Sequence, residues 1–173
     1  MVISGAQMSN TNKNQFTHLK IHTQYSICEG AIKIVDLKDF CKKNKIQAIG
    51  LSDTKNLCGA LEFAENISKV GTQPIIGSQI NFKFKDQIGI LPIIANNFEG
   101  YKSIIGLSSK SYLENKTTDE PHCSFQELLN IKSGVTILSG SFRGLIGNLF
   151  AKNLLTEIDE VLKLIKDVFK DKF

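Results

Sequence analysis

The stretch His18-Leu-Lys20-Ile-His22-Thr-Gln-Tyr-Ser26 is the part of the sequence from which the fold is best predicted. Its alternation predicts an extended strand over residues 16–23, in which every second side chain points to the same face. His18, Lys20 and His22 therefore share one face, at spacings of about 7 Å. Two neutral imidazoles can hold a divalent metal ion, whereas the ammonium group between them opposes one.

The composition is that of one ordinary soluble domain. The chain has 173 residues, of which 42% are hydrophobic and 22% charged, and this length is enough to bury a sizeable core. The net charge is +4, and the basic residues are interleaved with acidic or apolar ones, which favours solvated helix faces over a nucleic-acid-binding surface.

The sequence also predicts the compartment. No apolar run approaches the length of a membrane span, and the first residues lack the pattern of a secretory leader. The four cysteines form no Cys-x-x-Cys pair, so we expect reduced thiols. We therefore expect a cytoplasmic protein without membrane contact.

Helical and strand patterns alternate along the chain. Residues 1–15 are polar and lack periodicity, so a flexible segment is expected before a domain over residues 16–173. We expect Pro92 to shorten its strand or to confine it to a sheet edge. The order of elements indicates an α/β fold with a parallel sheet or barrel. Helices are predicted over 33–45, 57–70, 98–113, 125–131, a segment holding Leu149 and Phe150, and the last twenty residues, and strands over 47–51, 73–77, 80–84, 88–95 and 135–139.

A ligand site is expected where the strand over residues 47–51 ends. Ser52-Asp53-Thr54 follows this strand directly. In α/β folds the loops at the carboxyl ends of strands converge over the sheet and bind ligands.

Several blocks of the sequence, in order, resemble one known family. This is the PHP (polymerase and histidinol phosphatase) domain found at the N-terminus of bacterial DNA polymerase III alpha subunits. Its opening pattern is close to His-Leu-His-x-His-Thr/Ser-x-Tyr/Phe-Ser, with Lys20 at the middle histidine. The other matching blocks are Ala48–Ala60, Pro74–Gln79, Ala95–Ile104 and Ile137–Gly144.

The resemblance implies a distorted (β/α)7 TIM-like barrel, truncated here at its C-terminal end. It also implies a polymerase domain that docks the proofreading exonuclease subunit and other replicase subunits. DNA binding and the magnesium ions of nucleotidyl transfer would belong to a much longer protein, since no catalytic residue is expected in this segment.

The metal-ligand positions of the family are mostly substituted. Lys20 and Thr54 stand where the family has histidines, and Gln79 stands where it has a glutamate. Further positions hold Ile90 for a histidine and Ser141 for a cysteine. Hydroxyl and amide groups are weak ligands for zinc or manganese, so no metal centre or other cofactor is expected in this segment.

Three residues of these motifs keep potential donors. They are His18, His22 and Asp53, of which the resemblance makes His22 and Asp53 the true ligand positions and the residual metal candidates. The alternative interpretation of this pair is a polar network in the mouth of the fold. We further hypothesise that Lys20 replaces the metal as a structural cation facing Asp53 and Gln79.

Three functions remain open at this point. The first is the polymerase domain just described, with its phosphoesterase site degenerate. The second is a free-standing PHP-family metal-dependent phosphoesterase, against which the substituted ligand positions count. The third is a pure interaction module without chemistry.

Overall fold

The structure is a computed structural model that describes residues 16–116, 118–131 and 133–173, so the predicted flexible segment 1–15 lies outside it. Helices and strands alternate as the sequence predicts, and the helix predicted over 98–113 has those bounds. In chain order the elements are α1 (Ile34–Asn44), β1 (Ala48–Thr54), α2 (Ala60–Ser68), β2 (Gln73–Phe84), β3 (Gln87–Ala95), α3 (Phe98–Leu113), β4 (Cys123–Ser124), α4 (Phe125–Leu129), β5 (Val135–Ile137), α5 (Leu145–Ala151), α6 (Leu155–Phe169) and the 3-10 turn η1 (Lys170–Lys172).

The sheet is mixed and open. Its strand order is β1-β2-β3-β5, and β4 pairs with β2 further along the strand than β1 does. β1 and β4 run parallel to β2, whereas β3 is antiparallel to β2 and to β5. Only Lys85 and Asp86 join β2 to β3, and such a short connection forces antiparallel pairing. The α/β class is confirmed, and among the described residues the sheet does not close into a barrel.

Two strand boundaries differ from the sequence pattern. The segments predicted as separate strands over 73–77 and 80–84 form the single strand β2. β1 extends through Thr54, so Asp53 lies inside the strand and not after it. Residues 16–23 form no regular strand, because only Ile21 and Thr23 make isolated bridges.

Pro92 lies inside the sheet and does not end its strand. β3 has neighbours on both sides, and Pro92 is opposite Gln79 of β2, so the predicted edge position is wrong. On the other side its carbonyl accepts a hydrogen bond from the Leu138 N–H at 2.9 Å. Proline has no N–H to return, and the ladder between β3 and β5 ends at Ile93 and Ile137.

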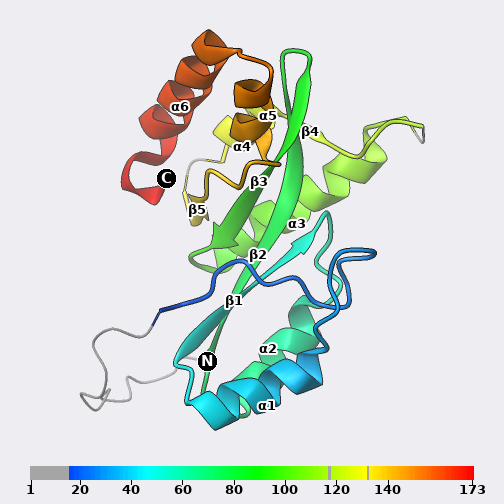
Figure 1. The fold of residues 1–173 in the computed structure, drawn as a ribbon, viewed down its shortest axis with the longest axis vertical. Coiled ribbons are helices and arrows are strands. Elements are labelled where there is room, and N and C mark those ends of the chain that lie inside the picture. The colour runs from blue at the N-terminus through cyan, green and yellow to red at the C-terminus, as the bar shows by residue number, and fades with distance from the viewer. Residues whose placement is uncertain (1–15, 117, 132) are drawn as a thin grey trace.

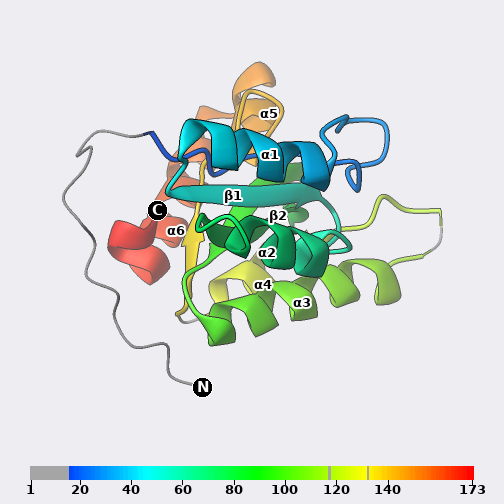
Figure 2. The same cartoon turned by 90° about the horizontal axis from the view of Figure 1, so that it is seen from below.

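The core consists of two hydrophobic clusters, and β2 runs from one to the other in Figure 1. Figure 2 shows α1, β1, α2 and α3 following one another across the molecule. The α1–α2 cluster consists of Ile34, Leu37, Cys41, Ile49, Leu51, Ala60, Phe63 and Ile67. The α3–α6 cluster includes Ile80, Phe82, Leu91, Ile93, Ile104, Leu128, Val135, Leu145, Leu149, Val161 and Ile165.

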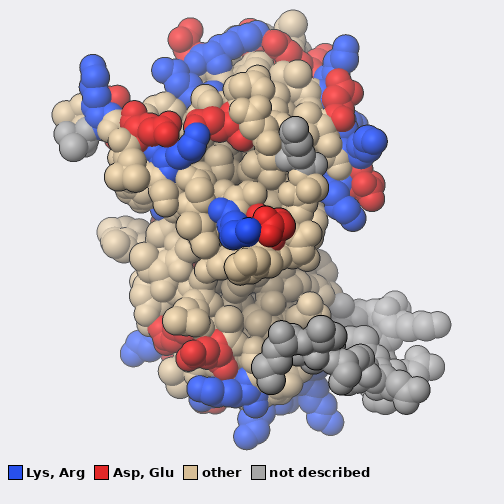
Figure 3. Space-filling view, turned by 180° about the vertical axis from the view of Figure 1, so that it is seen from behind, with Lys and Arg blue, Asp and Glu red and all other residues tan. Residues whose placement is uncertain are grey.

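Charged side chains on the surface are paired or mixed in sign. The face in Figure 3 carries basic and acidic groups above and below a middle region that is nearly free of both. Lys85 contacts Glu160 and Lys110 contacts Glu127, at 2.6 and 3.0 Å. This mixture agrees with the interpretation of solvated helix faces. In the described part of the chain, no helix combines the length and apolar character needed to cross a membrane.

Candidate functional site

The predicted site residues come together where β1 ends beside the middle of β2. The parallel register places Thr54 beside Gln79. Ile90 of β3 bridges to Gly144, which brings the turn before α5 to the same place. These elements surround a cavity of about 180 Å³. It is lined by Lys20, His22, Glu29, Gln79, Ile90, Ser141, Arg143 and Gly144, and we call it the β-end pocket.

Most of the predicted residues line the β-end pocket or support it, and His18 does not. His18 is exposed and lies edge-on to the Phe16 ring, with 4.9 Å between ring centroids. Its backbone carbonyl accepts a hydrogen bond from the Gly50 N–H, which holds the N-terminal stretch along β1. The sharing of one functional face by His18, Lys20 and His22 is therefore not observed, because residues 16–20 are irregular.

Asp53 lies beneath the pocket with no exposed surface. Its Oδ1 accepts from the Thr23 N–H at 2.6 Å and from the Ser26 hydroxyl at 2.7 Å, and its Oδ2 accepts from the Thr23 hydroxyl at 2.7 Å. Both oxygens of the Asp53 carboxylate therefore already accept hydrogen bonds from within the protein. Lys20 forms no ion pair with Asp53 among the described residues, so the predicted contact between these two side chains is wrong, whereas Lys20 and Gln79 do line the same pocket.

Polar groups surround the ring of His22. The amide nitrogen of Gln79 lies 3.1 Å from its Nε2. An amide NH₂ can only donate, so Nε2 is the acceptor and the neutral ring carries its proton on Nδ1. Nδ1 faces the hydroxyls of Ser26 and Thr54 at 3.3 and 3.4 Å. The lone pair with which His22 would bind a metal is therefore used by Gln79.

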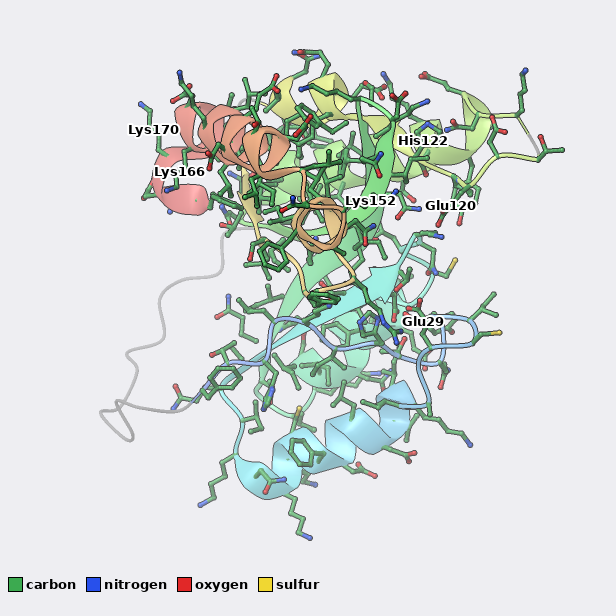
Figure 4. All side chains as sticks on the ribbon, turned by 45° about the horizontal axis from the view of Figure 1, so that its top comes forward. Glu29, Glu120, His122, Lys152, Lys166 and Lys170 are labelled. Atoms are coloured by element: carbon green, nitrogen blue, oxygen red, sulfur yellow. The ribbon has the colours of Figure 1, made fainter. Side chains whose placement is uncertain are left out.

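Thr54 links this ring to a carboxylate that the sequence analysis did not single out. Its hydroxyl accepts from the Gln79 amide at 3.0 Å and donates to Glu29 at 2.5 Å. The Glu29 carboxylate also lies 3.9 Å from Nδ1 of His22. Figure 4 labels Glu29 on the loop that follows His22. The pattern gave no signal for Glu29, because its position depends on how this loop folds.

A second residue missed by sequence reasoning is Arg143. It is the only arginine in the sequence and comes two residues after Ser141. Its side chain lines the β-end pocket, and its backbone N–H donates to the Ser141 hydroxyl at 3.4 Å. An arginine in the matched block Ile137–Gly144 was the available signal.

Hydrogen bonds also fix the loops around the pocket. The Tyr25 hydroxyl donates to Glu62 of α2 at 2.6 Å, and this carboxylate raises the pKa of Tyr25. On the other side Glu120, labelled in Figure 4, accepts from Lys55 at 2.7 Å and from the buried Asn81 at 3.0 Å. The bond from Lys55 is the main cause that lowers the pKa of Glu120.

The donor set does not suit a transition-metal ion. A zinc or manganese site needs imidazole, carboxylate or thiolate lone pairs that converge on one point. Here the Asp53 oxygens and the Nε2 of His22 accept hydrogen bonds, while Lys20 and Arg143 add positive charge. No group of three or more His, Cys, Asp or Glu side chains among residues 16–116, 118–131 and 133–173 could hold a metal ion.

Fold and site together define an α/β domain with a polar pocket at the carboxyl end of β1, beside the middle of β2. Within this class the chain belongs to the PHP domain family, whose model matches residues 18–173. Over 166 residues it is 32% identical to the DNA polymerase III subunit alpha of Haemophilus influenzae, which is 94% of this chain and 14% of that protein. The same subunit of Rickettsia felis is 33% identical over 164 residues, 92% of this chain and 13% of that protein.

The chain thus spans about one seventh of the curated relatives that it matches. Among solved structures, a protein from Bifidobacterium adolescentis assigned as a metal-dependent phosphoesterase aligns with 55% of this chain and 32% of its own. That alignment has 16% identity and a TM-score of 0.45.

Proposed function

We propose that the chain is the N-terminal PHP domain of a bacterial replicative DNA polymerase, the DNA polymerase III alpha subunit, and that it serves there as a structural and docking domain. Template-directed nucleotidyl transfer would belong to the longer protein, whose own carboxylates would bind magnesium. This segment would have no catalytic residue. The compartment would be the cytoplasm, where replication proteins of bacteria act.

One observation carries the proposal. The similarity to polymerase subunits extends over 94% of the chain, yet the positions that should bind metal hold a network of internal hydrogen bonds. An amide at position 79 donates to His22, where a glutamate would offer lone pairs to a metal ion. This combination supports a domain that is retained for its architecture and not for hydrolysis.

The proposed partners are the proofreading exonuclease subunit and other replicase subunits, with DNA bound through the full-length polymerase. The docking role is tested by producing the 173-residue chain together with the exonuclease subunit from the same organism. We expect both proteins to elute as one complex in size-exclusion chromatography. The Lys20→Gln variant is the matched control. Because the Lys20 side chain lies in the β-end pocket, we expect this substitution to leave docking unchanged and the variant to elute in the same complex. Separate elution of wild-type chain and exonuclease would contradict the docking role.

The proposed absence of a metal centre is tested by introducing the ligand residues of the family. We expect the triple variant Lys20→His, Thr54→His, Gln79→Glu to bind zinc and to gain thermal stability when zinc is added, because three lone-pair donors replace groups that oppose or barely bind a metal. Wild-type protein should show no such gain. Elemental analysis and thermal unfolding with and without zinc measure both.

One result would favour the free-standing phosphoesterase instead. Wild-type protein would then contain stoichiometric zinc or manganese and would hydrolyse p-nitrophenyl phosphate. This activity would disappear in the His22→Ala variant.

A further inference from the structure

Two cations line the β-end pocket without partners among the described residues. Lys20 comes from the N-terminal stretch and Arg143 from the turn before α5, so they reach the pocket from segments far apart in the sequence. Neither side chain forms an ion pair or a hydrogen bond with another described residue. Ion pairs elsewhere on this surface, such as Lys85 with Glu160, show that acidic groups are available to other lysines.

The charge balance of the pocket is positive. Glu29 is the one carboxylate among its lining residues, and it already accepts a hydrogen bond from Thr54. Without counting His22, the ammonium and the guanidinium outweigh this single negative charge by one. The pocket therefore attracts anions, and the same charges oppose a metal ion.

The other lining groups suit an oxyanion. The Ser141 hydroxyl accepts from the backbone of Arg143, and its own O–H donates to no other described residue, so it can donate to a ligand. A guanidinium offers two parallel N–H groups that match two oxygens of a phosphate, and an ammonium adds a point charge. The cavity of about 180 Å³ has room for one phosphate group.

We propose that the β-end pocket binds a phosphate group through Lys20, Arg143 and Ser141, and that it holds this group without hydrolysing it. The ligand is a phosphate dianion, either free or at the end of a nucleotide or DNA strand. The side chains of Lys20 and Arg143 would thus supply the positive charge that metal ions supply in other members of the family, and phosphate binding would need no metal. The inference concerns the pocket alone and does not depend on docking to replicase subunits.

The experiment is a calorimetric titration of the 173-residue chain with inorganic phosphate, at constant ionic strength and in buffer freed of metal ions. We expect saturable binding of one phosphate per chain. The variants Lys20→Gln and Arg143→Gln should each weaken binding about tenfold, since each removes one charge-assisted hydrogen bond. Lys42→Gln, an exposed lysine on α1 outside the pocket, should leave the affinity unchanged.

A variant that should raise the phosphate affinity provides a second test. Glu29→Gln removes the negative charge of the pocket while its amide oxygen can still accept from Thr54, so phosphate should bind more tightly. Thermal unfolding of each variant shows whether it is folded. Titrations with a nucleoside monophosphate and with a 5′-phosphorylated oligonucleotide then identify the source: tighter binding of one of them than of inorganic phosphate marks the attached group as part of the ligand.

Two results would overturn the proposal. One is the absence of saturable phosphate binding by folded wild-type protein. The other is binding that Lys20→Gln and Arg143→Gln weaken no more than Lys42→Gln does, which would indicate a general ionic effect. In either case the test of docking by co-elution is unaffected, so the two proposals fail separately.

Discussion

Asp53 is a charged side chain with no exposed surface, and one short loop supplies its three donors. Removing the carboxylate leaves the Thr23 and Ser26 donors buried without an acceptor. We expect Asp53→Ala to lower the free energy of unfolding by about 3 kcal/mol, the range found when a hydrogen-bonded charged group is deleted. Urea denaturation at neutral pH measures this.

The matched control is Asp39→Ala, whose exposed carboxylate forms an ion pair with Lys38 at 3.7 Å and with no other described residue. Such surface pairs contribute less than about 1 kcal/mol. A loss for Asp53→Ala no larger than that of the control would contradict the role assigned to these hydrogen bonds.

Residue by residue, the resemblance predicted the positions of the site better than it predicted their contacts. The positions His22, Gln79 and Ser141 do converge on one pocket. The contact between Lys20 and Asp53 was wrong because the sequence does not show that the loop hydroxyls already occupy this carboxylate. Contacts of this kind depend on the path of residues 23–30, which no periodicity encodes.

The loop between α3 and β4 is tied to the strands by Glu120, which accepts from Lys55 of the β1–α2 connection and from Asn81 of β2. Because the Lys55 bond lowers the pKa of Glu120, folding favours the ionised carboxylate. The stability that it contributes is present above the unfolded-state pKa of about 4.3 and is lost as the pH falls through the lower folded-state pKa.

We therefore expect Glu120→Gln to be less stable than wild type at neutral pH, and the difference to shrink in acid. Urea denaturation of both proteins across this pH range measures the difference. Glu65→Gln is the control, because this exposed glutamate on α2 has no ion pair among the described residues. A stability difference between Glu120→Gln and wild type that stays constant or grows in acid would contradict the role assigned to the Glu120 hydrogen bonds.

Strand β4 carries a cysteine that should be chemically inert. Burial raises the pKa of Cys123 to about 12, and its thiol donates to the Leu107 carbonyl at 3.2 Å. Cys41 is also buried, and burial raises its pKa as well, whereas Cys28 and Cys58 are exposed. The thiolate is the reactive form, so Ellman's reagent should modify two thiols of the native protein and all four after denaturation. Rapid modification of more than two would contradict this packing.

At the scale of elements, the sequence predicted helices better than strands. The helix over 98–113 was found at its predicted bounds, because its apolar spacing persists for four turns and Asn97 caps it by accepting from the Gly100 N–H at 2.9 Å. The direction of β3 could not be predicted from composition, since it depends on the tight turn at Lys85 and Asp86. The position of Pro92 in the sheet was predicted wrongly, because a proline is also tolerated inside a sheet at the point where the hydrogen-bond ladder to one neighbouring strand ends.

The whole molecule has two hydrophobic clusters that share β2. Phe63 is fully buried in the α1–α2 cluster, and Leu128 is fully buried in the α3–α6 cluster. We expect Phe63→Ala and Leu128→Ala each to cost about 3 kcal/mol or more. We also expect each variant to unfold in a single calorimetric transition, because the two clusters share one continuous strand.

The matched control is Leu61→Ala on α2, whose side chain is 72% exposed and should change the stability little. Two separate transitions, with each substitution shifting only one of them, would show that the clusters unfold independently.

The path of β2 has a practical consequence for anyone who wishes to divide this protein. Its first residues pair with β1, and its last residues pair with β4. A gene boundary placed anywhere within it would give one fragment an unfinished sheet and the other an exposed apolar edge. Shortened versions intended for crystallisation or for display of the pocket should therefore keep this strand whole.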